Sequence, residues 1–172
     1  FFFIFLLSSG NSRLYAEENR AFNFSTLNLN NGLSQLSVLD ICQDDKGYIW
    51  FATRNGLNKY DGTHFTIYKH SNRDNNSLSD NHITKLLPDN VRGGLWVGTN
   101  NGLNYLDPKT NLITNYQLAD YPELPSNSIL SLCLDKSGKL WVGTRLGLCF
   151  WQPENKTFKL VTLDGQLDKE SI

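Results

Sequence analysis

Short apolar runs that end in turn signals recur along the chain, and we interpret them as β-strands. The first run of each set is rich in Leu and β-branched residues and ends in an Asp/Lys/Gly turn such as DDKG or DKSG, which is typical of a strand closed by a tight turn. No stretch of a dozen residues has apolar residues at 3.6-residue spacing. The pattern therefore predicts first strands at 38–43, 83–87 and 129–134.

Three further strands follow each first strand. A Trp-containing strand comes next, and Asn55-Gly56 and Asn101-Gly102 then predict two-residue turns that accept positive φ at both positions. At the third such place stands Leu146-Gly147, with Leu in a position that these turns do not favour. Asp-Gly, Asp-Pro or Gln-Pro pairs break the third strands, so each unit is expected to be a four-stranded antiparallel meander whose last strand lies at 65–69, 113–117 or 158–162.

These units form an internal repeat. Three segments align without a gap: IWFATRNGLNKYDG (49–62), LWVGTNNGLNYLDP (95–108) and LWVGTRLGLCFWQP (140–153). Four-stranded units of about 45 residues, apolar on both sheet faces, are typical of β-propeller blades. The repeat therefore predicts an all-β fold in which a repeated Trp packs against the neighbouring blade, at Trp50, Trp96 and Trp141. The blades are expected at about 38–82, 83–128 and 129–171.

Three blades do not close a ring, because propellers typically have about four to eight. The sequence therefore predicts an incomplete propeller over 33–172, a fragment of a longer protein whose remaining blades would be its partners in the same chain. Residues 167–172 repeat the L-x-x-x-x-V/I pattern that opens each unit. We expect a fourth unit to begin there.

The first residues predict an export signal. Phe1 to Leu7 form an unbroken apolar run, which is too short for the roughly 20 apolar residues that span a bilayer. The run has the length of a signal-peptide core without its basic start, and Ala16 is a cleavage position, although Leu14 stands where a small residue is preferred. We expect a truncated signal peptide over 1–16 and a lead-in strand over 17–32. An internal buried strand is the alternative interpretation of the apolar run.

Composition excludes two classes of protein. With 16 Lys and Arg against 17 Asp and Glu, a net charge of −1 and no basic block, the chain lacks the electrostatic footprint of a nucleic-acid-binding segment. Three cysteines do not form a disulfide framework, and Cys133 and Cys149 are expected two strands apart, about 10 Å, beyond disulfide reach. We therefore predict free, buried thiols.

The repeat resembles a known family. The pattern D-x-x-G-x-[IL]-W-[FV]-[AG]-T-x-x-G-L, present as DDKGYIWFATRNGL and DKSGKLWVGTRLGL, is similar to the two-component regulator propeller repeat. The resemblance implies the periplasmic sensor region of a hybrid two-component protein of the inner membrane, which detects oligosaccharides. It also implies a homodimer through the full-length protein, and regulation of transcription through a histidine kinase that lies outside this segment.

Candidate ligand-binding residues lie in the second-to-third-strand turns. Alternate turns of a meander emerge on alternate faces, so these turns should share one face with the inter-blade loops 70–81 and 120–128. Polar and cationic side chains there can bind sugar hydroxyls, uronate or sulfate groups, and the candidates are Arg54, Asn100 and Arg145. The alternative is that these side chains are only solvated and that Asn55 and Asn101 serve the turns.

No catalytic motif is found in the sequence. The three histidines, His64, His70 and His82, lack H-x-H or H-E-x-x-H spacing, and there is no C-x-x-C or G-x-S-x-G. We expect no catalytic residue, metal or cofactor in this segment. Two alternatives to a kinase-linked sensor stay open: an exported propeller enzyme such as a lyase, and a sensor with a diguanylate-cyclase output.

Overall fold

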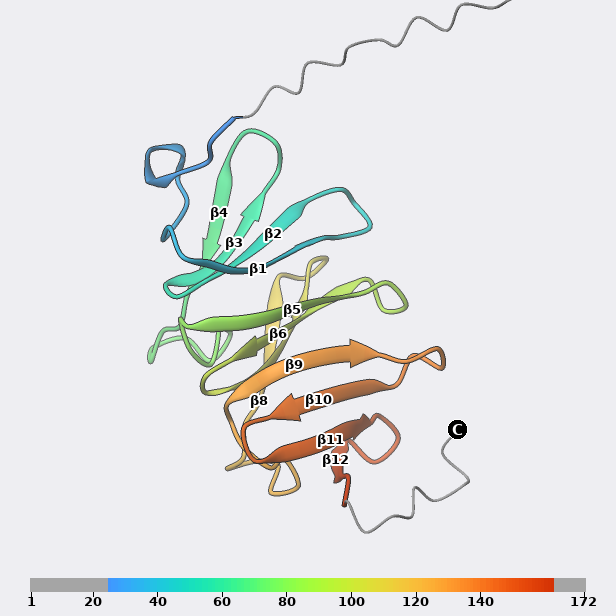
Figure 1. Cartoon of the computed structure of the whole chain (residues 1–172). Coiled ribbons are helices and arrows are strands. Elements are labelled where there is room, and N and C mark those ends of the chain that lie inside the picture. The colour runs from blue at the N-terminus through green and yellow to red at the C-terminus, as the bar shows by residue number, and fades with distance from the viewer. Residues whose placement is uncertain (1–24, 163–172) are drawn as a thin grey trace, which may run out of the picture.

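A computed structural model describes residues 25–162, and the strands of this part form three four-stranded antiparallel sheets (Figure 1). Blade 1 contains β1 (Val38–Gln43), β2 (Ile49–Thr53), β3 (Gly56–Tyr60) and β4 (Phe65–Tyr68). Blade 2 contains β5 (Ile83–Asp89), β6 (Gly94–Thr99), β7 (Gly102–Asp107) and β8 (Leu112–Tyr116). Blade 3 contains β9 (Ile129–Leu134), β10 (Leu140–Thr144), β11 (Gly147–Gln152) and β12 (Thr157–Leu160). Each blade has its strands in sequence order, which confirms the predicted all-β meanders.

The three first strands lie next to one another. In Figure 1, β1, β5 and β9 follow one another down the molecule. Hydrogen bonds link them: Leu86 N donates to Asp40 Oδ2 at 3.0 Å, and Thr84 Oγ1 donates to the Ile129 carbonyl at 2.7 Å. Lys85 Nζ also lies 3.4 Å from Asp40 Oδ2. Such links between first strands set the angle at which one blade meets the next.

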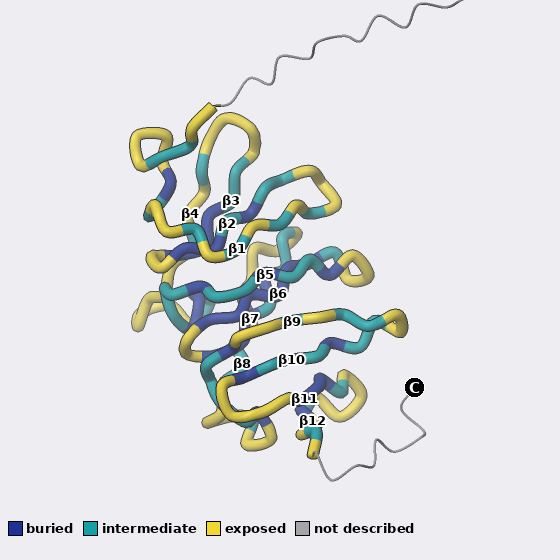
Figure 2. Tube along the Cα trace, viewed as in Figure 1, coloured by how far each residue is buried: buried dark blue, intermediate teal, exposed yellow. Residues whose placement is uncertain are grey.

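Apolar side chains fill both junctions between blades. One core cluster joins Trp50 of blade 1 to Ile83 and Val97 of blade 2, and the other joins Trp96 of blade 2 to Trp151 of blade 3. Figure 2 shows the result, with burial concentrated in the middle of blade 2 and exposure at the turns and along β9. The predicted core role is confirmed for the first two repeated Trp residues, each 1% exposed. Their equivalent Trp141 is only half-buried, because blade 2 packs on the opposite face of blade 3 and no described strand covers the face on which Trp141 lies.

The two-residue hairpin turns lie one residue earlier in the chain than predicted. Thr53 pairs with Gly56 across the ladder, so the two turn residues are Arg54 and Asn55, and only the glycine has positive φ, at 118°. A Cβ on Gly56 would lie 2.7 Å from the carbonyl oxygen of Tyr68, so the position requires glycine. In blade 3 the left-handed residue is Gly147, which explains why Leu146 is tolerated in the turn.

The described residues before blade 1 hold a 3-10 turn, Leu29–Asn31, and no strand lies between 25 and 37. The rest of the expected lead-in strand, the signal peptide over 1–16 and the fourth unit at 167–172 lie outside the described residues. Within residues 25–162, no helix has the length and hydropathy needed to cross a membrane.

The cysteine prediction was partly wrong. All three thiols are free, as predicted, but only Cys149 is buried, whereas Cys42 is half-buried and Cys133 is exposed. Position 133 pairs with Trp141 on the open face of blade 3, while Cys42 packs against the core between blades 1 and 2. Burial raises the pKa of both Cys42 and Cys149 to about 12.

Candidate functional site

The second-to-third-strand turns and the inter-blade loops share one face of the molecule, called here the hairpin face. The N–H of Gly56 donates to the Asn81 carbonyl at 2.8 Å, and the N–H of Gly102 donates to the Asn127 carbonyl at 2.7 Å. Each hairpin is thereby tied to the loop that leads into the next blade, as predicted. In Figure 1 these turns and loops lie at the left ends of the strands.

The three predicted ligand residues occupy equivalent places on the hairpin face. Arg54, Asn100 and Arg145 are each the first residue of their hairpin turn, and all three are exposed. The Arg145 N–H donates to the Ser128 carbonyl at 3.0 Å, and the Asn100 N–H to the His82 carbonyl at 3.2 Å, so their backbones are anchored. Their side chains form no hydrogen bond or ion pair with residues 25–162. Their role in ligand binding stays a prediction.

Sequence reasoning missed the residues that shape the inter-blade loops. Asn81 Oδ1 accepts the N–H of His70 at 2.8 Å, and Asn127 Oδ1 accepts the N–H of Leu118 at 2.6 Å. Each Asn therefore closes the loop with its side chain while its carbonyl holds the hairpin. The signal was present in the repeat, because an Asn follows three residues after both Leu78 and Leu124.

A buried polar cluster supports the hairpin face in blades 1 and 2. In blade 1, Ser34 N–H donates to Asn58 Oδ1 at 2.8 Å, and the Ser34 and Thr53 hydroxyls are 3.0 Å apart. In blade 2, Ser79 and Asn104 repeat the first contact at 2.8 Å. Both Asn side chains are fully buried, so each is held rigidly beneath the exposed turn.

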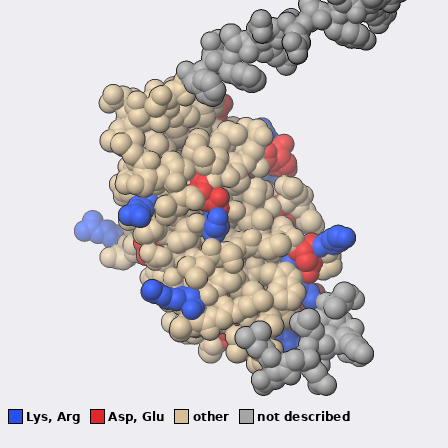
Figure 3. Space-filling view, viewed as in Figure 1, with Lys and Arg blue, Asp and Glu red and all other residues tan. Residues whose placement is uncertain are grey.

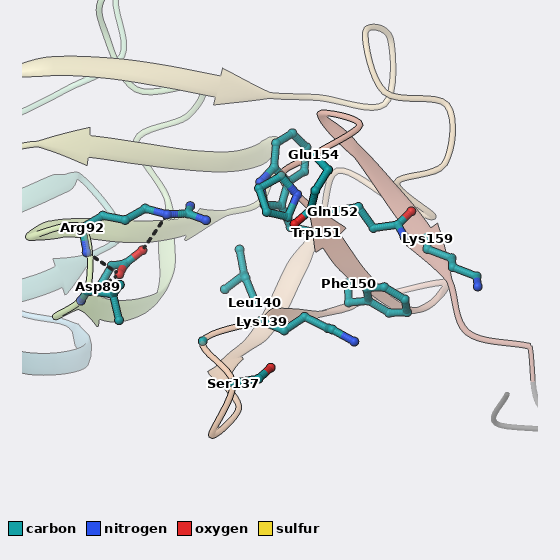
Figure 4. A pocket seen from close by; sticks show the side chains of 13 residues that line it. Asp89, Arg92, Ser137, Lys139, Leu140, Phe150, Trp151, Gln152, Glu154 and Lys159 are labelled. Atoms are coloured by element: carbon teal, nitrogen blue, oxygen red, sulfur yellow. Dashed lines mark hydrogen bonds and ion pairs between the residues drawn. The ribbon is translucent and has the colours of Figure 1, made fainter. Parts of the chain in front are cut away.

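The opposite face carries a groove of about 480 Å³ between blades 2 and 3 (Figure 4), called here the turn groove. Its walls come from the β5–β6, β9–β10 and β11–β12 turns. The lining residues are Asp89, Val91, Arg92, Ser137, Gly138, Lys139, Leu140, Phe150, Trp151, Gln152, Pro153, Glu154 and Lys159. The three predicted ligand residues are not among them.

A repeated Asp organises the turns on the groove side. Oδ2 of Asp44, Asp89 and Asp135 accepts the indole N–H of the Trp in the same blade at 2.9, 3.1 and 3.0 Å. Oδ1 of each accepts backbone N–H groups of the turn. Hydrogen bonds from Ser137 and Trp141 hold the pKa of Asp135 well below its usual range. These carboxylates therefore serve the fold.

The histidines lie outside the turn groove. His64 is in the exposed β3–β4 turn, and His70 Nδ1 and Nε2 lie 2.6 and 2.8 Å from the Leu78 carbonyl and Asn72 Oδ1. Residues 25–162 contain no group of three His, Cys, Asp or Glu side chains that could hold a metal ion. In the view of Figure 3, Lys and Arg form separate small groups scattered over the surface.

Two segments of the chain match a known family. Residues 32–55 and 123–145 match the family described as two component regulator propeller, which confirms the resemblance inferred from the repeat. Over 62 residues the chain is 47% identical to Histidine kinase P4 of Formosa agariphila. That stretch covers 36% of this chain and 4% of the kinase, so the chain spans a small part of this relative.

Solved structures show a similar fold. The chain superposes on PorZ, described as an essential surface component of the type-IX secretion system of Porphyromonas gingivalis, with a TM-score of 0.55 and 24% identity over 67% of this chain and 17% of PorZ. A second structure is described as the extracellular domain of a hybrid two component system from B. thetaiotaomicron, with a TM-score of 0.44 and 25% identity over 81% of this chain and 26% of that one. The PorZ likeness supports the propeller fold.

Proposed function

We propose that this chain, which carries two-component regulator propeller repeats, is part of an extracytoplasmic propeller that senses a ligand for a two-component signalling protein. The main support for the proposal is the arrangement of residues on the hairpin face. Equivalent exposed residues of three successive blades lie there beside the inter-blade loops, and the backbones of two of them, Asn100 and Arg145, are anchored by hydrogen bonds to those loops. The identity with a histidine kinase over 62 residues supports a kinase as the output.

The hairpin face suits an extended ligand. Arg54 and Arg145 supply guanidinium groups that bind carboxylate or sulfate in a bidentate manner, and the Asn100 amide donates to and accepts from hydroxyl groups. Because these residues belong to different blades, a ligand that touches more than one must extend across a blade junction. An oligosaccharide has this shape and these groups. Its binding would bias the angle between blades, since one ligand would then contact two of them.

In the proposed pathway, the ligand changes the geometry of a homodimer of the full-length protein at the inner membrane. A histidine kinase on the other side of the membrane reads that change and regulates transcription. The propeller itself contributes binding, and the kinase contributes the phosphoryl transfer.

Calorimetric titration of the full-length protein with neutral, uronate-containing and sulfated oligosaccharides tests the proposal, with ligand-dependent autophosphorylation as the signalling readout. We expect Arg54→Ala and Arg145→Ala each to weaken binding of an acidic oligosaccharide by about 1.5 to 3 kcal/mol, the range for charged hydrogen bonds. The matched controls, Lys46→Ala and Lys136→Ala, remove exposed cations from the opposite face and should leave binding unchanged. Unchanged affinity in both arginine variants would remove these residues from the site.

A further inference from the structure

We propose that Lys69 is a further ligand-binding residue of the hairpin face, and that the hairpin of blade 1, which it contacts, binds the acidic part of the ligand. The neighbouring hairpin of blade 2 then binds hydroxyl groups of the same ligand. The inference rests on the function proposed above, and it adds the order in which an extended ligand crosses the blades. The ligand class is an oligosaccharide that bears a carboxylate or sulfate group.

Lys69 follows β4, yet its side chain reaches the hairpin turn between β2 and β3. A Cβ added to Gly56 would lie 3.2 Å from Lys69 Cγ, so the lysine stem lies against the hairpin glycine. Lys69 Nζ donates to Asn55 Oδ1 at 3.2 Å. Asn55 and Arg54 are the two residues of this turn. The exposed turn therefore has a guanidinium group on its first residue and an ammonium group bound to its second.

Both cations keep N–H donors for a ligand. An ammonium group has three, and the hydrogen bond to Asn55 uses one of those of Lys69. The Arg54 side chain forms no hydrogen bond or ion pair with residues 25–162, and no carboxylate oxygen in this part of the chain lies within 4.0 Å of either cation. Charge-assisted hydrogen bonds to a carboxylate or sulfate are stronger than neutral ones. The blade 1 hairpin therefore favours the acidic part of a ligand.

The hairpin of blade 2 has the same construction without the charges. Gln117 is the equivalent of Lys69, because each follows a Tyr that pairs with the Leu after the hairpin glycine. A Cβ on Gly102 would lie 2.9 Å from Gln117 Cγ, and Gln117 Nε2 donates to the Asn101 carbonyl at 2.8 Å. The first turn residue here is Asn100. Since amides both donate to and accept from hydroxyl groups, this hairpin suits the neutral part of a sugar chain.

The repeat shows that the fold does not require Lys69. In blade 2, Asn101 Oδ1 accepts from Asn127 Nδ2 at 3.2 Å, whereas in blade 1 the equivalent Asn55 Oδ1 accepts from Lys69. Asn81 is the equivalent of Asn127 beside the blade 1 hairpin, and it makes the same contacts through its carbonyl and its Oδ1. An uncharged partner for Asn55 is therefore already in place, and the lysine charge is open to a role in binding.

The test is calorimetric titration of the full-length protein with two matched pairs of probes: trigalacturonic acid and its methyl ester, and lactose 3′-sulfate and lactose. We expect at least one acidic probe to bind at least about tenfold more tightly than its neutral counterpart. Lys69→Gln copies the residue of blade 2, so it should keep the thermal unfolding midpoint while it lowers that preference by about tenfold. Lys69→Arg keeps the charge and should keep the preference. Lys46→Gln, which removes an exposed cation from the opposite face of the same blade, is the matched control.

Autophosphorylation measured on the same proteins separates this inference from the proposed function. If the acidic preference depends on Lys69 but the kinase does not respond to the bound probe, the sensing role fails and the inference holds. If a probe stimulates the kinase with the same concentration dependence in wild type and in Lys69→Gln, the inference fails and the sensing role holds. The inference is also overturned if Lys46→Gln lowers the preference as much as Lys69→Gln does, or if neither acidic probe binds more tightly than its neutral counterpart at concentrations up to about 10 mM.

Discussion

Blades 1 and 2 build the region beneath the hairpin face differently from blade 3. In blade 2, fully buried Asn104 accepts the N–H of Ser79 through Oδ1, at 2.8 Å, and donates to the Val97 carbonyl at 3.1 Å. Blade 1 has the same Ser and Asn. Blade 3 has Pro125 and Cys149 at these two positions, and the cysteine is fully buried.

The two replacements in blade 3 compensate for each other. Pro125 has no N–H, so no acceptor is needed where Asn104 supplies one in blade 2. The Cys149 thiol donates to the Val142 carbonyl at 3.7 Å, so blade 3 keeps a weaker equivalent of the hydrogen bond between Asn104 and the Val97 carbonyl. A buried donor and its acceptor have been removed together, which costs far less than removing either alone.

A second difference concerns the edge near the groove. Lys59 Nζ of blade 1 lies 3.6 Å from the ring centroid of Tyr48, whereas in blade 3 the cation is Lys139 and the ring is Phe150. These are the same two positions of the repeat with the partners exchanged. The blade tolerates either arrangement because the interaction requires only that an ammonium group lies over an aromatic ring. It does not matter which of the two positions carries the cation and which carries the ring. Exchange of the partners moves the cation into the lining of the turn groove.

The repeated Trp residues give the largest expected difference between blades. Trp96 is 1% exposed and packs between blades 2 and 3, so Trp96→Ala should lower the free energy of unfolding by about 3 to 5 kcal/mol. Trp141 is half-buried, and Trp141→Ala should cost less than half as much. Urea unfolding of the chain, followed by circular dichroism, measures both losses. Equal losses would contradict the burial difference between the two blades.

Two substitutions convert the Ser–Asn pair of blade 2 into the Pro–Cys pair of blade 3. Asn104→Cys alone leaves the Ser79 N–H buried without its acceptor, which should cost about 1 to 3 kcal/mol. Adding Ser79→Pro removes that donor, so the double variant should recover about 1 kcal/mol relative to the sum of the single variants. Urea unfolding of the four proteins in this double-mutant cycle gives the coupling. Additive losses would show that the Pro and Cys of blade 3 are independent.

Substitutions in two hairpins test which turn position requires positive φ. Gly56→Ala forces a Cβ against the Tyr68 carbonyl at a φ of 118°, and should cost about 1 to 3 kcal/mol. Leu146→Asn, at the neighbouring turn position in blade 3, should change stability by less than about 0.5 kcal/mol, because that residue has negative φ. Thermal unfolding of both variants distinguishes these sites. A large gain from Leu146→Asn would place the left-handed residue one position earlier.

Acid stability gives the smallest expected effect. Hydrogen bonds, first from Ser137 and then from Trp141, lower the pKa of Asp135, so its ionised form stabilises the folded state above the pKa of an unfolded Asp, about 3.9. That contribution is lost as the pH falls below this value. Asp135→Asn should therefore show a shallower fall in thermal midpoint between about pH 5 and pH 2 than wild type. Parallel pH profiles would assign the acid sensitivity to other carboxylates.

The strands and their order followed from local signals. First strands at 38–43 and 129–134 begin and end as predicted, since turn residues on both sides bound short runs of β-formers. The shared face of the hairpin turns and inter-blade loops also followed, because alternate turns of a meander must alternate between faces. The family was identified from the same repeated residues.

Other features depended on contacts that the local pattern did not show. The one-residue shift of the hairpins follows from the Thr53–Gly56 pairing within the hairpin and from the Thr53 hydroxyl, which donates to the Gly56 carbonyl at 2.8 Å. The exposure of Cys133 depends on which face of blade 3 is covered. Its equivalent Cys42 was indistinguishable in sequence, yet blade 2 packs against it.

The sequence by itself determined the repeat, the four-stranded blades and the face on which Arg54, Asn100 and Arg145 lie, because each depends on neighbours within one unit. The tertiary structure decided which Trp is buried and how Pro125 and Cys149 compensate. It also decided that Arg92 and Lys139 line one groove. These features join residues of different strands or blades, and the distance between such residues is set by packing, which no local pattern encodes.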